Sequence, residues 1–188
     1  MPLSPQPTDL TASISVSNEL LQTVLEPYKP HCRYLQTATV EHSKTRGNGV
    51  TAVGEFSIAE SCYIADTGHF NAVEFNICYN QLSYCLLAQC VQDRLLDALD
   101  AWDLAEYQRR QLSDFLIVEF NSVFRKPMNA REFRGQVKID KVATRRESVF
   151  MKTTCNFEDC TGGWSEGGAL IVILGDHRAE MARRQADL

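Results

Sequence analysis

The sequence is short of the features that mark membrane, secreted and nucleic-acid-binding proteins. No apolar run approaches the roughly 20 residues that a membrane-spanning helix needs. Residues 1–15 lack the basic start, apolar block and cleavage signature of a secretory signal. No basic cluster is interleaved with aromatic residues, and the net charge is −5. We therefore expect no membrane segment, no signal peptide and no nucleic-acid partner.

The seven cysteines also lack a recognisable pattern. They are odd in number, scattered and mostly embedded in apolar sequence, and no two of them form a Cys-x-x-Cys pair. This usage favours reduced core thiols in a cytoplasmic protein over a disulfide framework. Cys155 and Cys160 flank a predicted hairpin turn, where a buried or turn cysteine is a better interpretation than a metal ligand. We expect no metal site.

The length and composition of the chain indicate one domain. Its 188 residues can bury a full core, and its contents of apolar residues (44%), glycine (10) and proline (6) are ordinary. A start rich in Pro, Ser and Thr predicts a loose tail over residues 1–15. The folded domain is expected over residues 16–176, and a charged tail over residues 177–188.

The region from Phe70 to Gln92 is the most unusual part of the sequence. It is apolar, contains neither Gly nor Pro, and carries a single formal charge, Glu74. The run is too long for a strand, so it predicts a helix that is buried nearly all round. Its polar residues are chiefly neutral amides, which need hydrogen-bond partners when they are buried.

Strands are predicted on both sides of this helix. A short helix opens near Val16 and ends at Pro27, and a shorter polar helix is expected over residues 104–114. A long Gly-rich hairpin loop is expected over residues 159–168. The predicted strands cover residues 33–40 and 50–58, joined by an Asn-Gly turn, and residues 115–124, 135–143, 148–157 and 168–174.

One long buried helix with a run of antiparallel strands predicts the α+β class. Strands packed around one apolar helix form the hot-dog arrangement, in which a curved sheet wraps around a central helix. Such a sheet has exposed edges, and pairing them across a two-fold axis is a common remedy. We therefore expect a homo-oligomer, at least a dimer.

Candidate catalytic residues gather where the chain enters the central helix. The first turn of a helix offers unpaired N–H groups and a partial positive charge, which polarise a thioester carbonyl and stabilise an enolate oxygen. Thr67 or His69 is expected near the helix cap, and Asn71 can add a side-chain donor. His69 can exchange protons near neutral pH, and Glu74 shares a helix face with Asn71.

Each candidate also has a purely structural interpretation. His69 can be a capping histidine, and Glu74 can be a first-turn acid that favours the helix dipole. The other candidates can be structural amides between helix and sheet or tyrosines at the core edge, namely Asn80, Gln81, Tyr28 and Tyr63. We interpret their concentration in a short segment as a sign of a site.

A second candidate cluster lies at a predicted strand end, where Arg125 and Lys126 precede Pro127. Two adjacent cations suit a phosphate or a carboxylate. A solvated strand end is the alternative interpretation.

These residues resemble the FcoT-like thioesterase family. The motif His-Phe-Asn-Ala-Val-Glu over residues 69–74 is the most specific part of the resemblance, which extends from about Glu19 to about Gly175. Supporting segments occur in the same order at Leu25–Tyr28, Cys32–Leu35, Tyr63–Ile64, Asn80–Leu82 and Phe124–Pro127, with Asn129. The region from Cys155 to Gly168 departs from the family pattern, so the resemblance assigns it no role.

The resemblance implies a hot-dog fold and two activities. The family is named for hydrolysis of long-chain acyl-coenzyme A, whereas relatives in secondary-metabolite clusters add glycine across the double bond of a (2E)-enoyl thioester on an acyl carrier protein. Products of that addition feed isonitrile lipopeptides or polyketides primed with β-amino acids. No cofactor is implied, because the substrate itself is carried on phosphopantetheine.

Our favoured hypothesis is the aza-Michael addition of glycine, and thioester hydrolysis or a non-catalytic acyl-binding subunit are the alternatives. The resemblance implies pocket roles for Tyr28, Tyr63, Asn71 and Asn80, and His69 and Glu74 match its motif. The hypothesis gives catalytic roles to His69, Glu74, Tyr63 and Asn71, and substrate-binding roles to Tyr28, Asn80, Ala72, Arg125 and Lys126.

Overall fold

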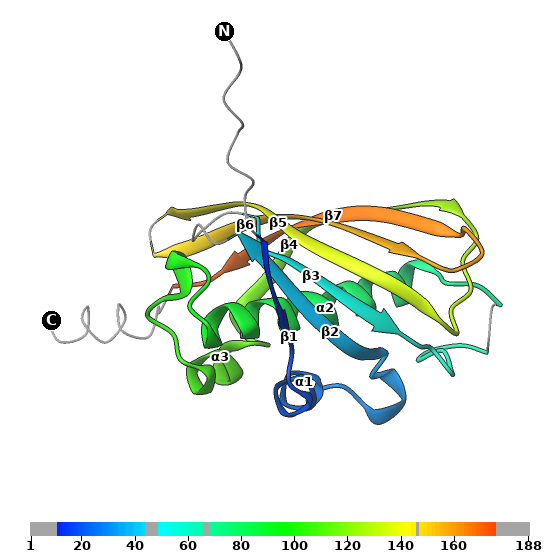
Figure 1. Ribbon diagram of the computed structural model, residues 1–188, viewed down its shortest axis with the longest axis horizontal. Helices are drawn as coiled ribbons and strands as arrows, with labels where there is room; N and C mark the ends of the chain where they lie inside the picture. Colours follow the sequence, from blue (N-terminus) through cyan, green and yellow to red (C-terminus); the bar gives the residue numbers. More distant parts are fainter. Residues whose placement is uncertain (1–10, 44–48, 66–67, 146, 176–188) are drawn as a thin grey trace, which may run out of the picture.

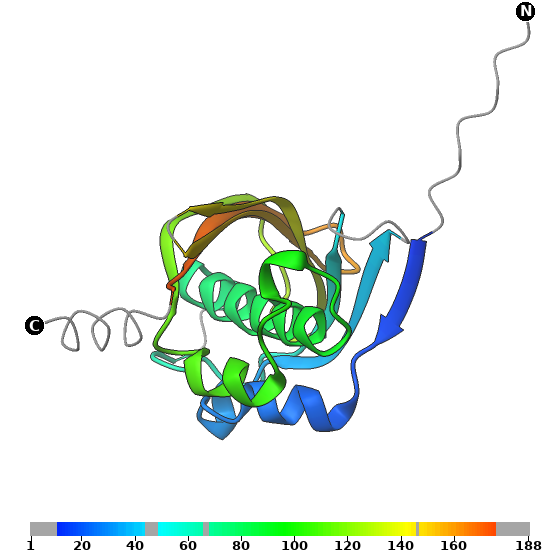
Figure 2. The ribbon, with the colours of Figure 1, turned by 90° about the vertical axis from the view of Figure 1, so that its left-hand side faces the viewer.

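The computed structural model describes residues 11–43, 49–65, 68–145 and 147–175. Seven antiparallel strands form one sheet in the order β1-β2-β3-β5-β6-β7-β4, and this sheet wraps around the long helix α2 (Figures 1 and 2). The strands are β1 (Thr11–Ser15), β2 (Leu35–Ser43), β3 (Thr51–Phe56), β4 (Phe115–Lys126), β5 (Phe133–Arg145), β6 (Ser148–Glu158) and β7 (Trp164–Ile173). The helices are α1 (Asn18–Leu25), α2 (Ala72–Gln92) and α3 (Leu104–Arg110), with short 3-10 turns η1 (Pro30–Cys32) and η2 (Asp97–Leu99). The predicted hot-dog arrangement is confirmed.

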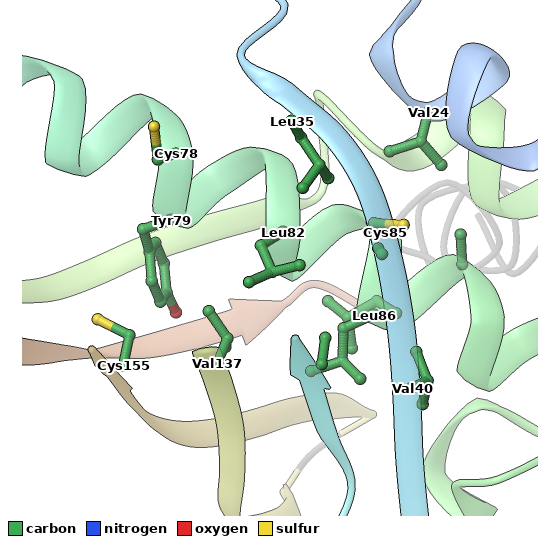
Figure 3. Close-up of a cluster of buried hydrophobic side chains, with 14 of the residues drawn as sticks. Val24, Leu35, Val40, Cys78, Tyr79, Leu82, Cys85, Leu86, Val137 and Cys155 are labelled. Carbon is green, nitrogen blue, oxygen red and sulfur yellow. The ribbon is translucent and has the colours of Figure 1, made fainter. Parts of the chain in front are cut away.

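Helix α2 is enclosed on most of its circumference. The sheet curves around it, and α1 and α3 cover part of the side that the sheet leaves open (Figure 2). Side chains such as Leu82 and Leu86 lie against the strands in a cluster that also contains Val40 and Val137 (Figure 3). A helix without a dominant polar face suits this position, because water reaches little of its surface.

Buried polar contacts complete the packing of α2 on the sheet. The Tyr79 hydroxyl lies 2.6 Å from Thr153 Oγ1, which in turn donates to the carbonyl of Ala169 at 3.2 Å. These bonds satisfy polar groups that would otherwise be buried without partners. The strand backbone also comes close to the helix: a Cβ at Gly167 would lie 2.2 Å from the Asn121 carbonyl and 3.0 Å from the Phe75 ring.

The two edges of the sheet differ. Strand β1 is a short edge of five residues, whereas β4 is a twelve-residue edge paired only with β7. Four apolar side chains of β4 are at least one-third exposed, namely Leu116, Val118, Val123 and Phe124. A long edge with exposed apolar side chains is a candidate surface for association with another chain.

Two predicted boundaries are wrong. Residues 11–15 were expected in the tail, but they form β1, with Ile14 packed against the core and Ser15 opposite Thr39 of β2. The predicted loop over residues 159–168 ends early, because β7 already begins at Trp164. Gly167 lies inside that strand, where its missing side chain permits close packing, and it is not a turn glycine.

The other predicted elements are confirmed with small shifts at their ends. The central helix starts at Ala72 and not at Phe70, and the polar helix ends at Arg110. Residues 46–48 of the predicted Asn-Gly turn and the tail over residues 177–188 lie outside the described residues.

Candidate active site

Asn71 is the N-cap of α2. Its side-chain Oδ1 accepts hydrogen bonds from the backbone N–H groups of Val73 at 3.0 Å and Glu74 at 3.2 Å. The Glu74 carboxylate accepts in return from the Asn71 N–H at 3.3 Å, which completes a capping box. The cap itself is thus Asn71, and His69 lies near it, two positions earlier, as expected. Thr67 lies outside the described residues.

The capping box fixes Glu74 but leaves donors at the helix start. Glu74 is only 3% exposed, and the structural interpretation of a first-turn acid is the one that its contacts support. The Asn71 side-chain Nδ2 is buried and has no hydrogen-bond partner among the described residues. Within the same part of the chain, no acceptor contacts the N–H of Ala72, the first helical residue. Both groups are donors that a carbonyl or enolate oxygen can occupy.

A hollow of about 480 Å³ joins the two candidate clusters of the sequence. It is lined on one side by residues 69–72 at the start of α2 and on the other by residues 124–127 at the end of β4. The motif segment and the cation pair, which are about 50 residues apart in the chain, thus share one site. The Phe124 ring lies 6.3 Å from the Phe70 ring and 5.7 Å from the Phe75 ring, so the wall of the hollow is aromatic.

The two cations at this hollow differ in their partners. Arg125 donates to the Glu166 carboxylate at 3.0 and 2.7 Å, and both side chains are about half exposed. Lys126 is exposed and forms no ion pair with a described residue. His69 is exposed at the rim. The arrangement suits an anionic group at the mouth of the hollow and a polarised carbonyl at the helix start.

Tyr63 lies at a different hollow. This second cavity of about 520 Å³ is lined by His31 and by residues 59–65. Tyr63 is 50% exposed, and the nearby Ser61 hydroxyl is buried without a hydrogen-bond partner among the described residues. In a single chain, Tyr63 is therefore not brought together with Asn71 and Lys126 in the first hollow.

Tyr28 and Asn80 line neither of these hollows. The Asn80 side chain donates to Asn76 Oδ1 at 2.8 Å, one turn earlier in α2. Tyr28 is partly buried; burial, together with the nearby Tyr84 and Cys78, raises the pKa of its phenol. Asn80 was also considered as a structural amide between helix and sheet. Its side-chain hydrogen bond stays within α2 and does not make that bridge.

Gln81 makes that bridge instead. Its Oε1 accepts from the N–H groups of Tyr34 and Leu35, both at 2.9 Å, and its Nε2 donates to the Cys32 carbonyl at 2.6 Å. The side chain is fully buried. Gln81 therefore holds the segment after Tyr28 against α2, and a buried amide in an apolar helix is the signal that predicted such a role.

Asp159 is a residue of this region that the sequence did not single out. Its carboxylate holds the turn between β6 and β7 and reaches the backbone of Asn129, just beyond the cation pair. The sequence Asp-Cys-Thr-Gly-Gly is a signal for such a turn, because an Asp side chain readily accepts from N–H groups two or more residues ahead.

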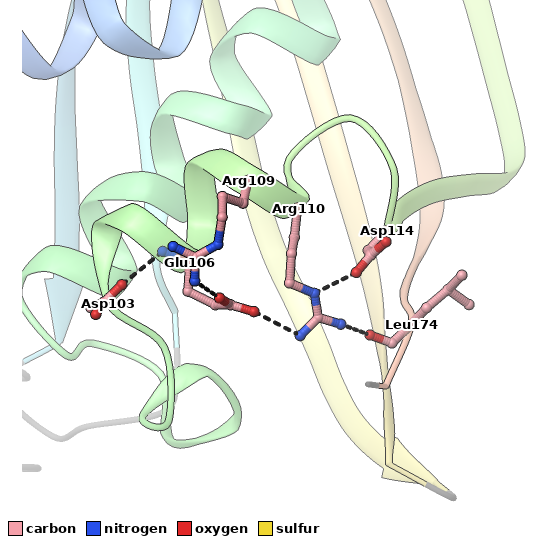
Figure 4. A network of polar contacts seen from close by, with 6 residues as sticks. All are labelled: Asp103, Glu106, Arg109, Arg110, Asp114 and Leu174. Atoms are coloured by element: carbon pink, nitrogen blue, oxygen red, sulfur yellow. Dashed lines mark hydrogen bonds and ion pairs between the residues drawn. The ribbon is translucent and has the colours of Figure 1, made fainter. Parts of the chain in front are cut away.

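A further hollow, of about 610 Å³, is lined by residues of η2 and α3, which follow the carboxyl end of α2, and by residues 173–175 at the end of β7. Arg110 of α3 stacks over the Trp102 ring at 4.2 Å and contacts Asp114, Glu106 and the Leu174 carbonyl (Figure 4). These charges already satisfy one another, so we assign this hollow a structural role at the sheet end.

Comparison with known proteins identifies the family. A model of the FcoT-like thioesterase domain matches residues 23–173. The chain belongs to the FcoT-like thioesterase family. Its match includes the capped start of α2 and the strand that carries the cation pair, so both halves of the first hollow are family segments.

Two curated relatives that share one named activity are similar to most of this chain. A (2E)-enoyl-ACP glycyltransferase of Streptomyces coeruleorubidus is 41% identical over 160 residues, which cover 82% of this chain and 95% of that protein. A (2E)-enoyl-ACP glycyltransferase of Mycobacterium tuberculosis strain H37Rv is 39% identical over 168 residues, which cover 87% of this chain and 90% of that protein.

Among solved structures, the dehydratase domain of RzxB from Pseudomonas fluorescens superposes with a TM-score of 0.52 at 11% identity, and the match covers 86% of this chain and 50% of that one. At this identity the likeness concerns the fold alone. Among the described residues, no helix is both long and apolar enough to span a membrane.

Proposed function

We infer that this chain adds glycine to the β-carbon of a (2E)-enoyl thioester carried on an acyl carrier protein, yielding an N-carboxymethyl-3-aminoacyl thioester for secondary metabolism. The observation that carries the proposal is the hollow that Asn71 and the start of α2 line on one side and the cation pair lines on the other. The Asn71 Nδ2 is a buried donor without a partner among the described residues. The identity of 35–41% to enzymes named (2E)-enoyl-ACP glycyltransferase supports the choice of reaction.

The helix start supplies the electrostatic part of the mechanism. The thioester carbonyl accepts from Asn71 Nδ2 and the Ala72 N–H, which draws electrons away from the β-carbon. When the amine nitrogen of glycine bonds to the β-carbon, the C=C electron pair shifts to form an enolate whose oxygen stays on these donors. Protonation of the α-carbon then completes the adduct, and no covalent enzyme intermediate forms.

Proton transfer falls to His69 in this proposal. Glycine attacks only as the neutral amine, so a base must take a proton from its ammonium group. His69 lines the hollow, whereas the Glu74 carboxylate is buried and already accepts from the Asn71 N–H. Glu74 then acts by fixing the helix start. Lys126, with Arg125, binds the phosphate of phosphopantetheine or the glycine carboxylate.

In this proposal, the remaining candidate residues contribute to the site from a second copy of the chain. Tyr63, Tyr28 and Asn80 lie outside the first hollow of one protomer, and β4 is a long apolar edge. Pairing of two β4 edges across a two-fold axis forms a dimer in which the pantetheine arm enters between subunits. A cytoplasmic setting is part of the proposal, and the seven free cysteines support it.

The experiment incubates the protein with an enoyl carrier-protein thioester, with and without glycine, and follows intact masses. A glycine-dependent gain of one glycine mass supports the proposal. Release of free acid at a rate independent of glycine identifies a hydrolase, the activity for which the family is named. Binding without turnover identifies an acyl-binding subunit.

Two matched variants separate the roles of the acid and the histidine. His69→Gln removes the base and is expected to lower kcat by about 10²-fold or more. Glu74→Gln preserves the capping box, because glutamine occupies this position as well as glutamate does. We expect Glu74→Gln to retain kcat within about threefold. A larger loss in Glu74→Gln than in His69→Gln would reverse the assignment.

A further inference from the structure

The short segment from Pro127 to Ala130, called the strut below, is held from three directions. The Met128 carbonyl accepts from the Phe70 N–H at 3.0 Å, directly before the cap of α2. The Ala130 carbonyl accepts from the N–H of Ile58 at 2.9 Å. On the third side, the Asn129 N–H donates to Asp159 Oδ2 at 2.6 Å. The strut follows Arg125 and Lys126 directly, so its position sets theirs relative to the helix start.

The two carboxylate oxygens of Asp159 have separate tasks. Oδ1 accepts from the N–H and hydroxyl of Thr161, both at 2.8 Å, and from the Gly163 N–H at 2.9 Å. These bonds close the turn between β6 and β7. Oδ2 bonds to the strut. The side chain is 8% exposed, so water does not readily replace any of these four donors.

The turn and the strut are also in tight steric contact. A Cβ at Gly163 would lie 2.3 Å from the Pro127 carbonyl oxygen and 2.8 Å from Asp159 Oδ2. Glycine therefore allows the turn to approach the strut closely enough for the short Asp159–Asn129 bond. A weaker second link joins the Ser165 hydroxyl to the Met128 sulfur at 3.3 Å.

We propose that Asp159 is a positioning residue for the active site. Through Oδ2 it fixes the strut, and through the strut it fixes the spacing between the cation pair and the start of α2. A ligand that spans this distance, with its phosphate at Arg125 and Lys126 and its thioester at Asn71, then binds without first ordering the strand end. The identity of that ligand rests on the proposed function. The proposal gives a role to the region between Cys155 and Gly168.

The variant Asp159→Asn tests the proposal, because it breaks one link selectively. Its amide oxygen can still accept the turn donors, but its Nδ2 then meets the Asn129 N–H donor to donor. Thr161→Val is the matched control, since it removes a hydrogen bond to Oδ1 within the turn and leaves the bond to the strut. Urea unfolding of both variants measures how much stability each change removes.

Coenzyme A, which carries the same phosphopantetheine arm, is the probe for binding by calorimetry. We expect Asp159→Asn to raise the Kd for coenzyme A and the KM for the enoyl carrier-protein thioester by about tenfold, with kcat changed less. Thr161→Val is expected to change both by less than about twofold. Equal effects of the two variants, or no binding of coenzyme A by the wild-type protein, would overturn the proposal.

The inference and the proposed reaction can fail separately. If the wild-type protein forms no glycine adduct but binds coenzyme A in an Asp159-dependent way, the reaction is wrong and the positioning role stands. If the adduct forms and Asp159→Asn matches Thr161→Val in KM, the positioning role is wrong. Should Asp159→Asn not fold, Gly163→Ala, which pushes on Pro127 from the same side, must raise the same Kd, and an unchanged Kd contradicts the proposal.

Discussion

At the scale of single residues, Asn71 divides one side-chain amide between two tasks. Its oxygen caps α2 by accepting from Val73 and Glu74, and its nitrogen is buried without a partner among the described residues. The same short side chain thus stabilises the helix through its acceptor and can bind the substrate carbonyl through its donor. The two tasks are separable, because other residues supply only one of them.

The variant Asn71→Asp is therefore expected to separate stability from turnover. The aspartate carboxylate still caps the helix, so the free energy of unfolding should stay within about 0.5 kcal/mol of wild type. The ionised carboxylate accepts but does not donate, so the oxyanion donor is lost and kcat should fall by about 10²-fold. Urea denaturation and the glycine-addition assay measure the two quantities. Asn71→Ala, the control, loses both tasks and should also lose about 1 kcal/mol of stability. Full turnover by Asn71→Asp would exclude the donor role.

At the scale of secondary-structure elements, the link between α2 and the start of β2 depends on Gln81. We expect Gln81→Leu to lower the free energy of unfolding by about 3 kcal/mol or more, because it leaves two N–H groups and a carbonyl buried without partners. Gln92→Leu is the matched control on the exposed end of the same helix and should change stability by less than about 0.5 kcal/mol. Similar losses in both variants would show that the buried bonds contribute little.

The turn between β6 and β7 should make the stability of the protein depend on pH. Burial opposes ionisation of Asp159, but the hydrogen bonds from Asn129, Thr161 and Gly163 outweigh it and lower the pKa to about 2 from 3.8. Since the folded-state pKa is depressed, the stabilisation is complete above the unfolded value and is lost as pH falls through about 2.

The difference in free energy of unfolding between wild type and Asp159→Asn should therefore depend on pH. It is expected to be constant from about pH 5 to pH 7 and to shrink between about pH 4 and pH 2, as measured by urea unfolding at a series of pH values. If the stability difference stays unchanged at the acid end of this series, the negative charge of Asp159 does not contribute to the stability of the turn.

The elements that the sequence predicted are those whose signal is local. Helix α2 was visible in its apolar run without Gly or Pro, and the alternating strands β5 and β6 in their period of two. Strand β1 was missed because its existence depends on an edge that β2 offers far along the chain. Gly167 was misread because its reason is a neighbour on β4 and not the local turn.

The site was predicted in part for the same reason. The motif segment and the cation pair were found separately, and the structure brings them to one hollow. The start of α2 was placed two residues too early, at Phe70, since sequence does not fix the first helical residue to within two positions. Asp159 was not recognised, because its partner Asn129 is 30 residues away. Tyr63, Tyr28 and Asn80 were grouped with Asn71, yet one protomer does not bring them to it.

At the scale of the whole molecule, the proposed dimer depends on the β4 edge. We expect the wild-type protein to be a dimer in light scattering and Val118→Lys to be a monomer, because lysine places a charge on an edge that must be buried. Leu112→Lys changes an even more exposed apolar residue outside β4 and should leave the dimer intact. A monomeric wild-type protein, or a dimer that survives Val118→Lys, would contradict the assignment of this edge.

The two tryptophans of the chain lie at opposite ends of the molecule. Trp102 stacks against Arg110 beside α3, and Trp164 is paired with Lys126 in the β4–β7 ladder, next to the hollow at the start of α2. Replacing Trp102 with phenylalanine leaves a single indole emitter, and Trp164 is 37% exposed to solvent. Intrinsic fluorescence of that variant should therefore report ligand occupancy directly, without a dye or a coupled assay.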